Sequence, residues 1–474
     1  MTKNFPGELS LWKGLAMDRR FELRKRQILK DAELKPELSN GMLDRLEAFA
    51  EPFASSLGRR EMKEHAHQYL GGLLSDLERK NIESIAYRYD QDRRGLQRFI
   101  GAAPWDFMPL EKELVCQVGN SLGRSDGVIV FDPSGHKKCG NDSVGVQRQW
   151  LGRLGKIENC QVGVYMGYVA RCDHALVASR LYLPKEWAKD RERRKKCGVP
   201  NEIRFQTRHE LALAMLKEHG SLLPHRWIAG DDEMGRSSAF RRQLRELEEL
   251  YLLAVPSNTS VRDLEVPLPP YAGRGPHPKP PFERVDRWCA SLSESEWTRI
   301  DVRDSEKGPL VLEIVKRRVL ARTERSRENL TEELLVVTRY KEHGGTMKYD
   351  YHLSNASADT TLDELARVTK AEHLIEDAIK RAKSQAGLSD YETRTWPGWY
   401  HHNVLSLIAT WFLACEMRRG EKIHSRRNGS SDSYALEITS PSSLRLRTSR
   451  LGDPVCTAKK PPQGTRSLLS LQET

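Results

Sequence analysis

The sequence predicts an α/β protein in which helices cover both faces of a mixed β-sheet. Short apolar runs at residues 128–131, 227–229 and 251–255 have the length and the β-branched content of strands. These runs are apolar throughout, which is typical of strands that are covered on both faces. Helical periodicity comes first in the chain, as in the leucines at i, i+3, i+4 and i+7 that begin with Leu70. A helical region therefore precedes the sheet.

The size and charge of the chain favour a large protein that binds anionic partners. The chain has 474 residues and a formal net charge of +11, and its isoelectric point is about 9.2. This length exceeds one typical domain. The basic balance favours anionic partners, with nucleic acid first. No apolar run reaches the roughly 20 residues that a bilayer span needs, and the first 40 residues lack the apolar core of a secretory signal. We expect a cytoplasmic protein, associated with the nucleoid and not with a membrane.

The first part of the chain is predicted to be helical after a basic arm. Residues 1–41 lack a core pattern, and we expect them to be poorly ordered. Residues 42–115 follow a helical period, and we expect this region to bind DNA.

Residues 116–265 contain the first part of the predicted sheet. Their β-prone runs are separated by glycine-containing turns or by helical stretches. The predicted strands are 128–131, 144–150, 160–169, 227–229 and 251–255, and the predicted helical stretches are 185–217 and 237–249.

A connector and a small β-rich insertion follow at residues 266–362. Seven prolines lie between residues 266 and 281, which is typical of a stiff extended connector. Three β-prone stretches come next, at residues 310–319, 334–339 and 348–353. They are rich in charge, so we expect them to form an insertion.

The chain then returns to the core with two helices. These helices are predicted at residues 363–385 and 399–417, within a last core segment of residues 363–419. Residues 420–474 are rich in serine, arginine and proline and lack periodicity, which predicts a disordered basic tail.

Two aspartates follow predicted strands. Asp132 comes directly after the run at residues 128–131, and Asp231 comes shortly after the run at residues 227–229. Strand ends hold side chains rigidly, as catalysis requires. The residues alone leave Asp231 ambiguous with Asp232 and Glu233.

A third acid lies on a predicted helix. Glu376 is inside the helical stretch 363–385, where Glu372 and Asp377 are alternatives by pattern alone. Hard divalent cations such as Mg²⁺ prefer oxygen ligands and often bind a phosphate as well. Two such ions, roughly 3.5–4 Å apart and bridged by carboxylates, catalyse phosphodiester cleavage. In a basic protein the three acids therefore indicate metal-assisted chemistry on nucleic acid.

Several ordered motifs make the chain similar to a known family. The stretches Val-Ile-Val-Phe-Asp-Pro-Ser-Gly at 128–135, Ser-Val-Gly-Val-Gln-Arg-Gln at 143–149 and Ile-Glu-Asn-Cys-Gln-Val-Gly at 157–163 resemble DDE-type transposases of bacterial insertion sequences. The stretches at 227–235 and 375–396 do so as well, and the resemblance runs from about residue 53 to residue 416. Members of this family have a core similar to RNase H and retroviral integrase. The resemblance implies an RNase H-like core that cuts transposon ends and joins them to target DNA with Mg²⁺ or Mn²⁺.

The resemblance selects among the candidate acids. Asp132 falls on the first aspartate of the family. Asp231 falls on the second, because the glycine expected four residues later is Gly235. Glu376 falls on the glutamate, with Lys383 seven positions on, as in the cut-and-paste branch with a Tyr–Arg–Glu–Lys signature. These three acids are expected to hold two metal ions, and Lys383, two helical turns beyond Glu376, to hold a DNA phosphate.

The chain departs from the signature at two positions. The tyrosine and arginine positions hold Thr369 and Glu372. Lys370 and His373 are the nearby cations that could replace the arginine. This departure keeps two alternative functions open, a catalytically inactive DNA-binding relative and a structure-selective nuclease with an RNase H fold. The family also implies a homodimer that brings two DNA ends together.

Further basic residues are predicted to contact DNA phosphates. One group directly follows Asp132, another belongs to a run with six cations at residues 189–196, and the last lies in the motif at residues 375–396. They are Lys137, Lys138, Arg193, Arg194, Lys195 and Arg394. An aromatic segment at residues 396–402 could stack on a flipped base, but core packing is the favoured interpretation.

Overall fold

A computed structural model of the chain describes residues 41–427, apart from residues 91, 172, 269, 272, 276, 306–307, 323–329 and 342–344. The predicted basic arm, except for Gly41, and residues 428–474 of the predicted tail lie outside the described residues. No helix of the described part is both long and apolar enough to cross a lipid bilayer.

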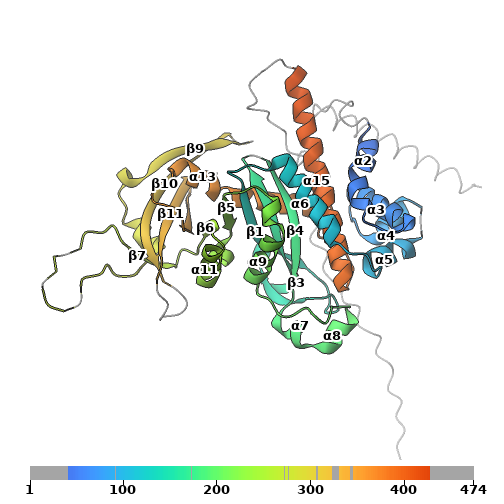
Figure 1. Ribbon diagram of the computed structural model, residues 1–474, viewed down its shortest axis with the longest axis horizontal. Helices are drawn as coiled ribbons and strands as arrows, with labels where there is room; N and C mark the ends of the chain where they lie inside the picture. Colours follow the sequence, from blue (N-terminus) through green and yellow to red (C-terminus); the bar gives the residue numbers. More distant parts are fainter. Residues whose placement is uncertain are drawn as a thin grey trace, which may run out of the picture. The chain divides into compact units, whose positions relative to one another are not determined.

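A mixed sheet forms the centre of the described part (Figure 1). Its core has the order β4-β3-β1-β5-β6. The antiparallel strands are β1 (Val128–Lys137), β3 (Lys156–Ala170) and β4 (Asp173–Tyr182), and β5 (Trp227–Gly230) and β6 (Leu250–Ala254) run parallel to β1. Three antiparallel strands followed by two strands parallel to the first make the RNase H-like core that the sequence predicts. A short strand, β2 (Gln147–Leu151), pairs with the beginning of β3.

The β-rich insertion continues the same sheet. β12 pairs antiparallel with β6, and β11, β10 and β7 follow in order. These strands are β7 (Ser260–Asp263), β8 (Glu283–Arg284), β9 (Thr298–Ser305), β10 (Gly308–Ala321), β11 (Glu332–Lys341) and β12 (Met347–Ser354). The three predicted strands of this segment are confirmed as β10, β11 and β12. A hydrophobic cluster that includes Val285 of helix α12 (Val285–Ala290) and Leu335 of β11 lies in this part of the molecule.

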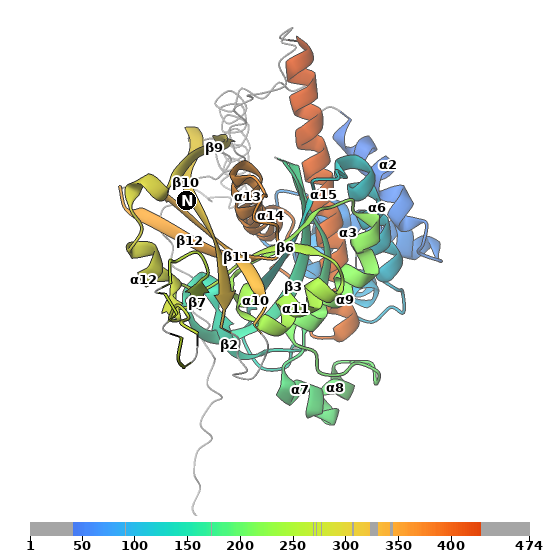
Figure 2. The same ribbon diagram turned by 60° about the vertical axis from the view of Figure 1, so that its left-hand side comes forward.

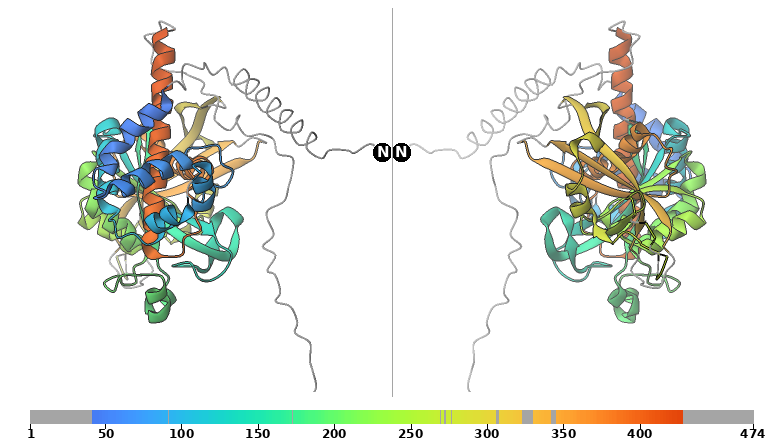
Figure 3. Two further views of the ribbon diagram at one scale, coloured as in Figure 1. Left: turned by 90° about the vertical axis from the view of Figure 1, so that its right-hand side faces the viewer. Right: turned by 90° about the vertical axis from the view of Figure 1, so that its left-hand side faces the viewer.

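In the described residues five helices precede the sheet, as the periodicity predicts. They are α2 (Met42–Ala54), α3 (Arg60–Leu73), α4 (Ile82–Arg88), α5 (Arg93–Gly101) and α6 (Met108–Leu122). Several of them pack along the last helix, α15 (Trp396–Arg427), which Figure 3 shows running behind them. Phe49 lies 5.2 Å from Phe412 between ring centroids, and the Tyr69 hydroxyl lies 2.9 Å from Nδ1 of His402. These helices share one hydrophobic core with the sheet.

The core strands are covered on both faces, as predicted. In β3, successive residues point to opposite faces of the sheet, and helices lie on both faces. Glycines face α15 and α14 (Ala371–Gln385), because a Cβ on Gly163 would lie 3.1 Å from Trp399 and one on Gly167 only 2.4 Å from Ile375. The next positions face the other way, where Tyr182, opposite Val162, carries the Arg208 guanidinium of α9 (Arg208–His219) over its ring. Figure 2 shows α14 and α9 apart, with core strands between them.

Two core strands, β1 and β4, differ most from the prediction, and β7, β8 and β9 were not predicted either. β1 extends to Lys137, so Asp132 lies inside a strand and not at its end, because β3 pairs with β1 along its whole length. β4 was not predicted. Polar residues lie at both ends of β4, which begins with Asp173 and ends with Ser179, Arg180 and Tyr182. The apolar part between them is short, so the sequence pattern did not predict a strand.

The helices also differ in their boundaries. The stretch 185–217 forms three helices, α7 (Lys185–Lys189), α8 (Arg191–Lys196) and α9, and the stretch 363–385 forms α13 (Leu362–Thr369) and α14. The predicted helix 237–249 is α11 (Ser238–Glu246), and α10 (Asp232–Arg236), which precedes it, was not predicted. The last helix continues to Arg427, beyond the predicted start of the tail at residue 420, through a stretch that contains no proline.

Candidate active site

Asp132 and Asp231 lie side by side at the point where two parallel strands stop pairing. The last paired row of β1 and β5 is Phe131 opposite Gly230, and each aspartate is the next residue. Neighbouring strands are about 5 Å apart. The register therefore brings the two predicted aspartates together.

The Asp231 carboxylate is fixed by the turn from β5 into α10. Its Oδ1 accepts a hydrogen bond from the Met234 amide at 3.0 Å, so Asp231 caps the helix. Gly235 lets this helix approach β6, because a Cβ there would lie 1.9 Å from the Ala254 carbonyl oxygen. The glycine that singled out Asp231 in the sequence thus has a packing role.

Helix α14 brings further acids to the aspartates. Ile375 of α14 packs against Gly167 of β3, and Gly167 lies opposite Val130 of β1. Val130 and Asp132 are two positions apart, so they lie on the same face of the sheet. Glu372 and Glu376 are one turn apart on this helix. Its contacts with β1, β3, β4 and β5 hold it over the strands that carry the aspartates.

The charged forms of both aspartates are disfavoured in the folded protein. Burial raises the pKa of Asp132 to about 7, and the Glu376 charge adds to this effect. Burial also raises the pKa of Asp231 well above its ordinary value, with the charges of Asp132 and Glu372 adding to it. Mutual repulsion of buried carboxylates is the electrostatic condition that a bound cation relieves.

Glu372 belongs to this group, although the resemblance gave the catalytic position to Glu376. Burial raises the pKa of Glu372 to about 8, and the charges of Asp132, Asp350 and Glu376 raise it as well. The sequence pattern did name Glu372 as an alternative, but nothing in it indicated that Glu372 would face the aspartates.

Glu376 lies at the outer side of the group. Its side chain is 53% exposed, and its carboxylate lies 3.0 Å from the Lys380 ammonium and 3.9 Å from Nδ1 of His373. His373 and Lys380 lower the pKa of Glu376 to about 2. Glu376 is therefore a stable anion that is paired with its own helix.

Lys383 is attached to the strand that carries Asp132. Its ammonium donates hydrogen bonds to Ser134 Oγ at 2.8 Å and to the Gly135 carbonyl oxygen at 3.2 Å. Its charge also lowers the pKa of Asp132, against the larger effect of burial. A phosphate bound beside Asp132 would meet this ammonium.

The donor set fits divalent cations in chemical type. All four side chains are carboxylates, which Mg²⁺ and Mn²⁺ prefer. Their oxygens are not gathered to ligand distances. Among the described residues, the group of three metal-ligand side chains with all ligand atoms within 4.8 Å of one another is Glu111, Glu218 and His219.

That other group is closed by an arginine. The Arg180 guanidinium donates to Glu111 Oε1 at 2.7 Å and also pairs with Glu218, while His219 Nε2 lies 3.0 Å from Glu111 Oε1. Arg180 occupies the place that a cation would take, so we interpret this group as a structural ion-pair network.

The predicted DNA contacts fall into two kinds. Lys137 and Lys195 are exposed, and Arg394 is exposed with its guanidinium 3.7 Å from Asp142. The other three already have close partners within the protein. Lys138 donates to the Tyr391 carbonyl oxygen at 2.9 Å, and burial lowers its pKa to about 7; Arg193 lies over the Trp187 ring; and Arg194 donates to three backbone carbonyls.

The residues proposed to replace the missing arginine are also engaged. Lys370 is buried with its ammonium 3.3 Å from Asp350, on a strand of the insertion, and His373 faces Glu376. In the aromatic segment, Trp399 and His402 are fully buried. The core interpretation of that segment is confirmed.

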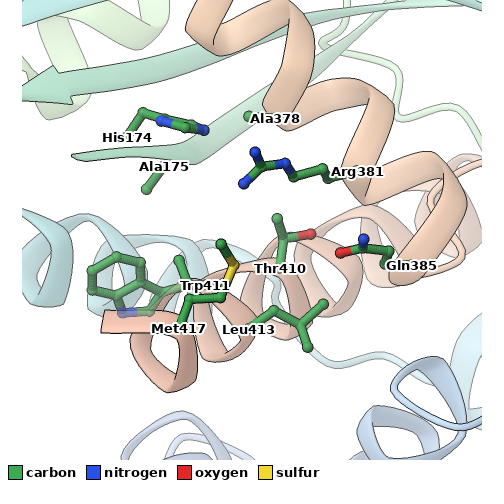
Figure 4. Close-up of a pocket in the computed structure, with 10 residues that line it drawn as sticks. His174, Ala175, Ala378, Arg381, Gln385, Thr410, Trp411, Leu413 and Met417 are labelled. Carbon is green, nitrogen blue, oxygen red and sulfur yellow. The ribbon is translucent and has the colours of Figure 1, made fainter. Parts of the chain in front are cut away.

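A small pocket lies on another side of α14 (Figure 4). It has a volume of about 30 Å³, and His174, Arg381, Gln385, Thr410 and Trp411 are among its lining residues. This is room for about one or two water molecules. It is too small for a nucleotide and contains none of the candidate acids.

The sequence is similar to known proteins. The family model described as DDE superfamily endonuclease matches residues 52–309, more than half of the chain. The match includes Asp132 and Asp231 and ends before Glu376. A probable transposase for insertion sequence element IS701 of Microchaete diplosiphon is 31% identical over 207 residues, which are 42% of this chain and 50% of the relative. The chain thus spans half the length of that relative.

A similar chain is also found among the solved structures. It belongs to a cryo-EM structure of a piggyBac transposase synaptic complex with hairpin DNA, at 13% identity and a TM-score of 0.37 over 83% of this chain and 78% of the other. A TM-score below 0.5 supports no conclusion about this chain.

Proposed function

The chain belongs to the DDE superfamily of endonucleases, and on this premise we propose that it is a transposase that cuts the ends of an insertion sequence and joins them to target DNA. One observation carries the proposal. Asp132 and Asp231 follow the same paired row of two parallel strands, and helix α14 adds Glu372 and Glu376 to them.

Asp132, Asp231 and Glu376 would hold two Mg²⁺ or Mn²⁺ ions. When bound, such ions activate the attacking oxygen and stabilise the charge on the scissile phosphate and the leaving oxygen. Glu376 has to turn from Lys380 and His373 toward the aspartates, which a side-chain rotation on an exposed helix surface permits. Glu372 already faces the aspartates and would support them.

The remaining groups position the DNA. Lys383 would hold a phosphate beside Asp132, and Lys137 and Lys195 would hold the backbone farther away. In the first reaction the oxygen of water bonds to phosphorus and the 3′-oxygen leaves with a proton. In the second, the freed 3′-hydroxyl attacks a target phosphodiester, and again one P–O bond forms while one breaks.

Joining two element ends to one target requires both ends to be held together. We propose that two copies of the chain do this as a homodimer, and that the helical region of residues 42–115 takes part in DNA binding. The place of action would be the cytoplasm, beside the nucleoid.

The test is cleavage of a plasmid that carries the reading frame with its native flanking DNA. With Mg²⁺ or Mn²⁺, the wild type is expected to nick at the element ends. Asp132→Asn, Asp231→Asn and Glu376→Gln are each expected to reduce cleavage at least a thousandfold, by analogy with the loss of a catalytic group, while DNA binding persists. Asp377→Asn is the matched control, since this exposed acid is adjacent to Glu376 and is not among the causes of the pKa shifts of the three acids.

Two other outcomes would identify the alternatives. DNA binding by the wild type without cleavage would indicate an inactive relative, a possibility favoured by Thr369 and Glu372 at the signature positions. Cleavage of branched DNA regardless of end sequence would indicate a structure-selective nuclease.

A further inference from the structure

The hairpin of β2 and β3 exposes two large apolar side chains. Trp150 and Ile157 are cross-strand partners, and 61% and 55% of their surfaces are exposed. Leu154, in the turn between the strands, is 37% exposed. An aromatic side chain and two aliphatic side chains together on one exposed hairpin indicate a contact surface.

The hairpin is anchored on its other side. Leu151, Cys160 and Val162 form a small buried cluster. Leu151 packs so closely against β1 that a Cβ on Gly135 would lie 2.3 Å from its Cδ1. The exposed pair is therefore presented by a fixed element of the fold, which Figure 3 shows at the lower edge of the sheet in teal.

The exposed pair lies on the same side of β3 as the catalytic aspartate. Asp132 is opposite Tyr165, and Trp150 is opposite Ile157. Tyr165 and Ile157 are eight positions apart in an unbroken strand, an even number, so their side chains leave the strand on the same side. Eight residues of a strand span about 26 Å, which is the length of about eight base pairs of duplex DNA.

The charge around the pair suits a nucleic acid. Arg148, two residues before Trp150 on the same side, is exposed, and the residue opposite it is Asn159. The Asn159 amide donates to the carbonyl oxygens of Lys138 and Gly140. This side of the hairpin thus has an arginine and no acid among the four paired residues.

We propose that the β2–β3 hairpin is a second DNA contact, in which Trp150 and Ile157 pack against the duplex and Arg148 binds a phosphate. The contact lies about eight base pairs from the cleaved bond. It contributes to affinity and positioning but not to the chemical step. This inference rests on the proposed function, because it places the contact relative to the scissile phosphate.

The experiment measures DNA binding by the full chain, without divalent metal so that no cleavage occurs. Fluorescence anisotropy with a labelled 30-base-pair duplex is expected to show about tenfold weaker binding for Trp150→Ala, the loss of one aromatic contact. Trp150→Phe is expected to restore most of the affinity. Arg148→Ala is expected to reduce the slope of log K against log salt by about one. Tyr271→Ala, an exposed aromatic of the connector, is the control that should bind as the wild type does.

A photoreactive residue at position 150 identifies the partner directly. Crosslinking to the labelled duplex supports the proposal. Crosslinking to a second copy of the chain, or unchanged affinity of Trp150→Ala, overturns it. If wild-type cleavage at the element ends is intact in that case, only the hairpin inference fails. A wild type that binds no DNA would remove the proposed function as well.

Discussion

Asp132 and Asp231 are neighbours because Phe131 lies opposite Gly230 in a parallel strand pair. Two carboxylates at adjacent strand positions and the half-buried Glu372 carboxylate repel one another. The fold accepts this repulsion because packing of the strands and of α14 fixes the positions of the side chains. Without a bound cation, this repulsion lowers the stability of the folded protein.

The metal-free protein is expected to lose stability as the pH rises from about 4 to 8. The pKa values of Asp132 and Glu372 are about 7 and about 8, above those of unfolded chains. The folded state therefore binds more protons than the unfolded state in this window, and the stability gained from these protons is lost as they dissociate. Mg²⁺ should offset this loss, so it should raise the melting temperature at pH 8.5 by at least about 2 °C more than at pH 5.5.

Differential scanning fluorimetry with Mg²⁺ or EDTA measures this effect. Asp132→Asn should abolish most of the difference between the two pH values, whereas Asp377→Asn should retain it. An equal effect of Mg²⁺ at both pH values would show that the ion does not bind at these carboxylates.

Replacement of Lys383 by methionine should impair cleavage and shift its pH dependence. The Lys383 charge lowers the pKa of Asp132, so its removal should raise that pKa further. The acid limb of the pH–rate profile should then move to higher pH, and the rate at its maximum should fall about a hundredfold through loss of the phosphate contact. Lys383→Arg, which keeps the charge, should preserve the position of the limb. If the acid limb of the Lys383→Met profile does not move, the Lys383 charge does not control the pKa of Asp132.

The sequence predicted the parts of the site that depend on local pattern. Asp132 and Asp231 follow short apolar runs that predict strands, and both strands are present. The strand register that makes them neighbours is not local, and only the structure gives it. Glu372 and Glu376 show the same limit, because residues one turn apart share a helix face and the pattern cannot tell which is buried.

The basic residues illustrate why charge runs mislead. Lys138 was predicted to contact DNA because it lies shortly after Asp132, and Arg194 because it belongs to a basic run. Their partners are the Tyr391 carbonyl, 253 positions away in the chain, and the carbonyls of the loop after α8. A sequence shows the donors but not the backbone acceptors that the fold brings to them.

Replacement of Lys80 by methionine should destabilise the protein by about 2 kcal/mol. The buried Lys80 ammonium donates to the carbonyl oxygens of Leu73 at 2.8 Å and of Gln385, the last residue of α14, at 2.5 Å. Methionine fills the space but leaves both acceptors without this donor. Chemical denaturation should show the loss, and Arg79→Met, at the exposed preceding position, should change the stability by less than about 0.5 kcal/mol. Equal stability of both variants would mean that other donors replace Lys80.

Replacement of Glu111 by glutamine should have the largest effect on stability of the changes proposed. Burial alone would raise the pKa of Glu111, but Arg180 and His219 outweigh it, so that this pKa lies below its ordinary value. The carboxylate is therefore charged at neutral pH, and its loss leaves the buried Arg180 guanidinium with only the half-exposed Glu218 as an anionic partner.

Loss of one member of a buried ion pair costs about 3–5 kcal/mol of stability. Urea denaturation should show this loss for Glu111→Gln. The control is Lys112→Gln, a change at the exposed next residue of α6. EDTA should leave this difference unchanged, because Arg180 is the cation of the network. If EDTA instead destabilised the wild type but not Glu111→Gln, a metal ion and not Arg180 would be the partner of this carboxylate. With Asp132→Asn as the background, the same comparison separates that outcome from metal loss at the proposed site of Asp132 and Asp231.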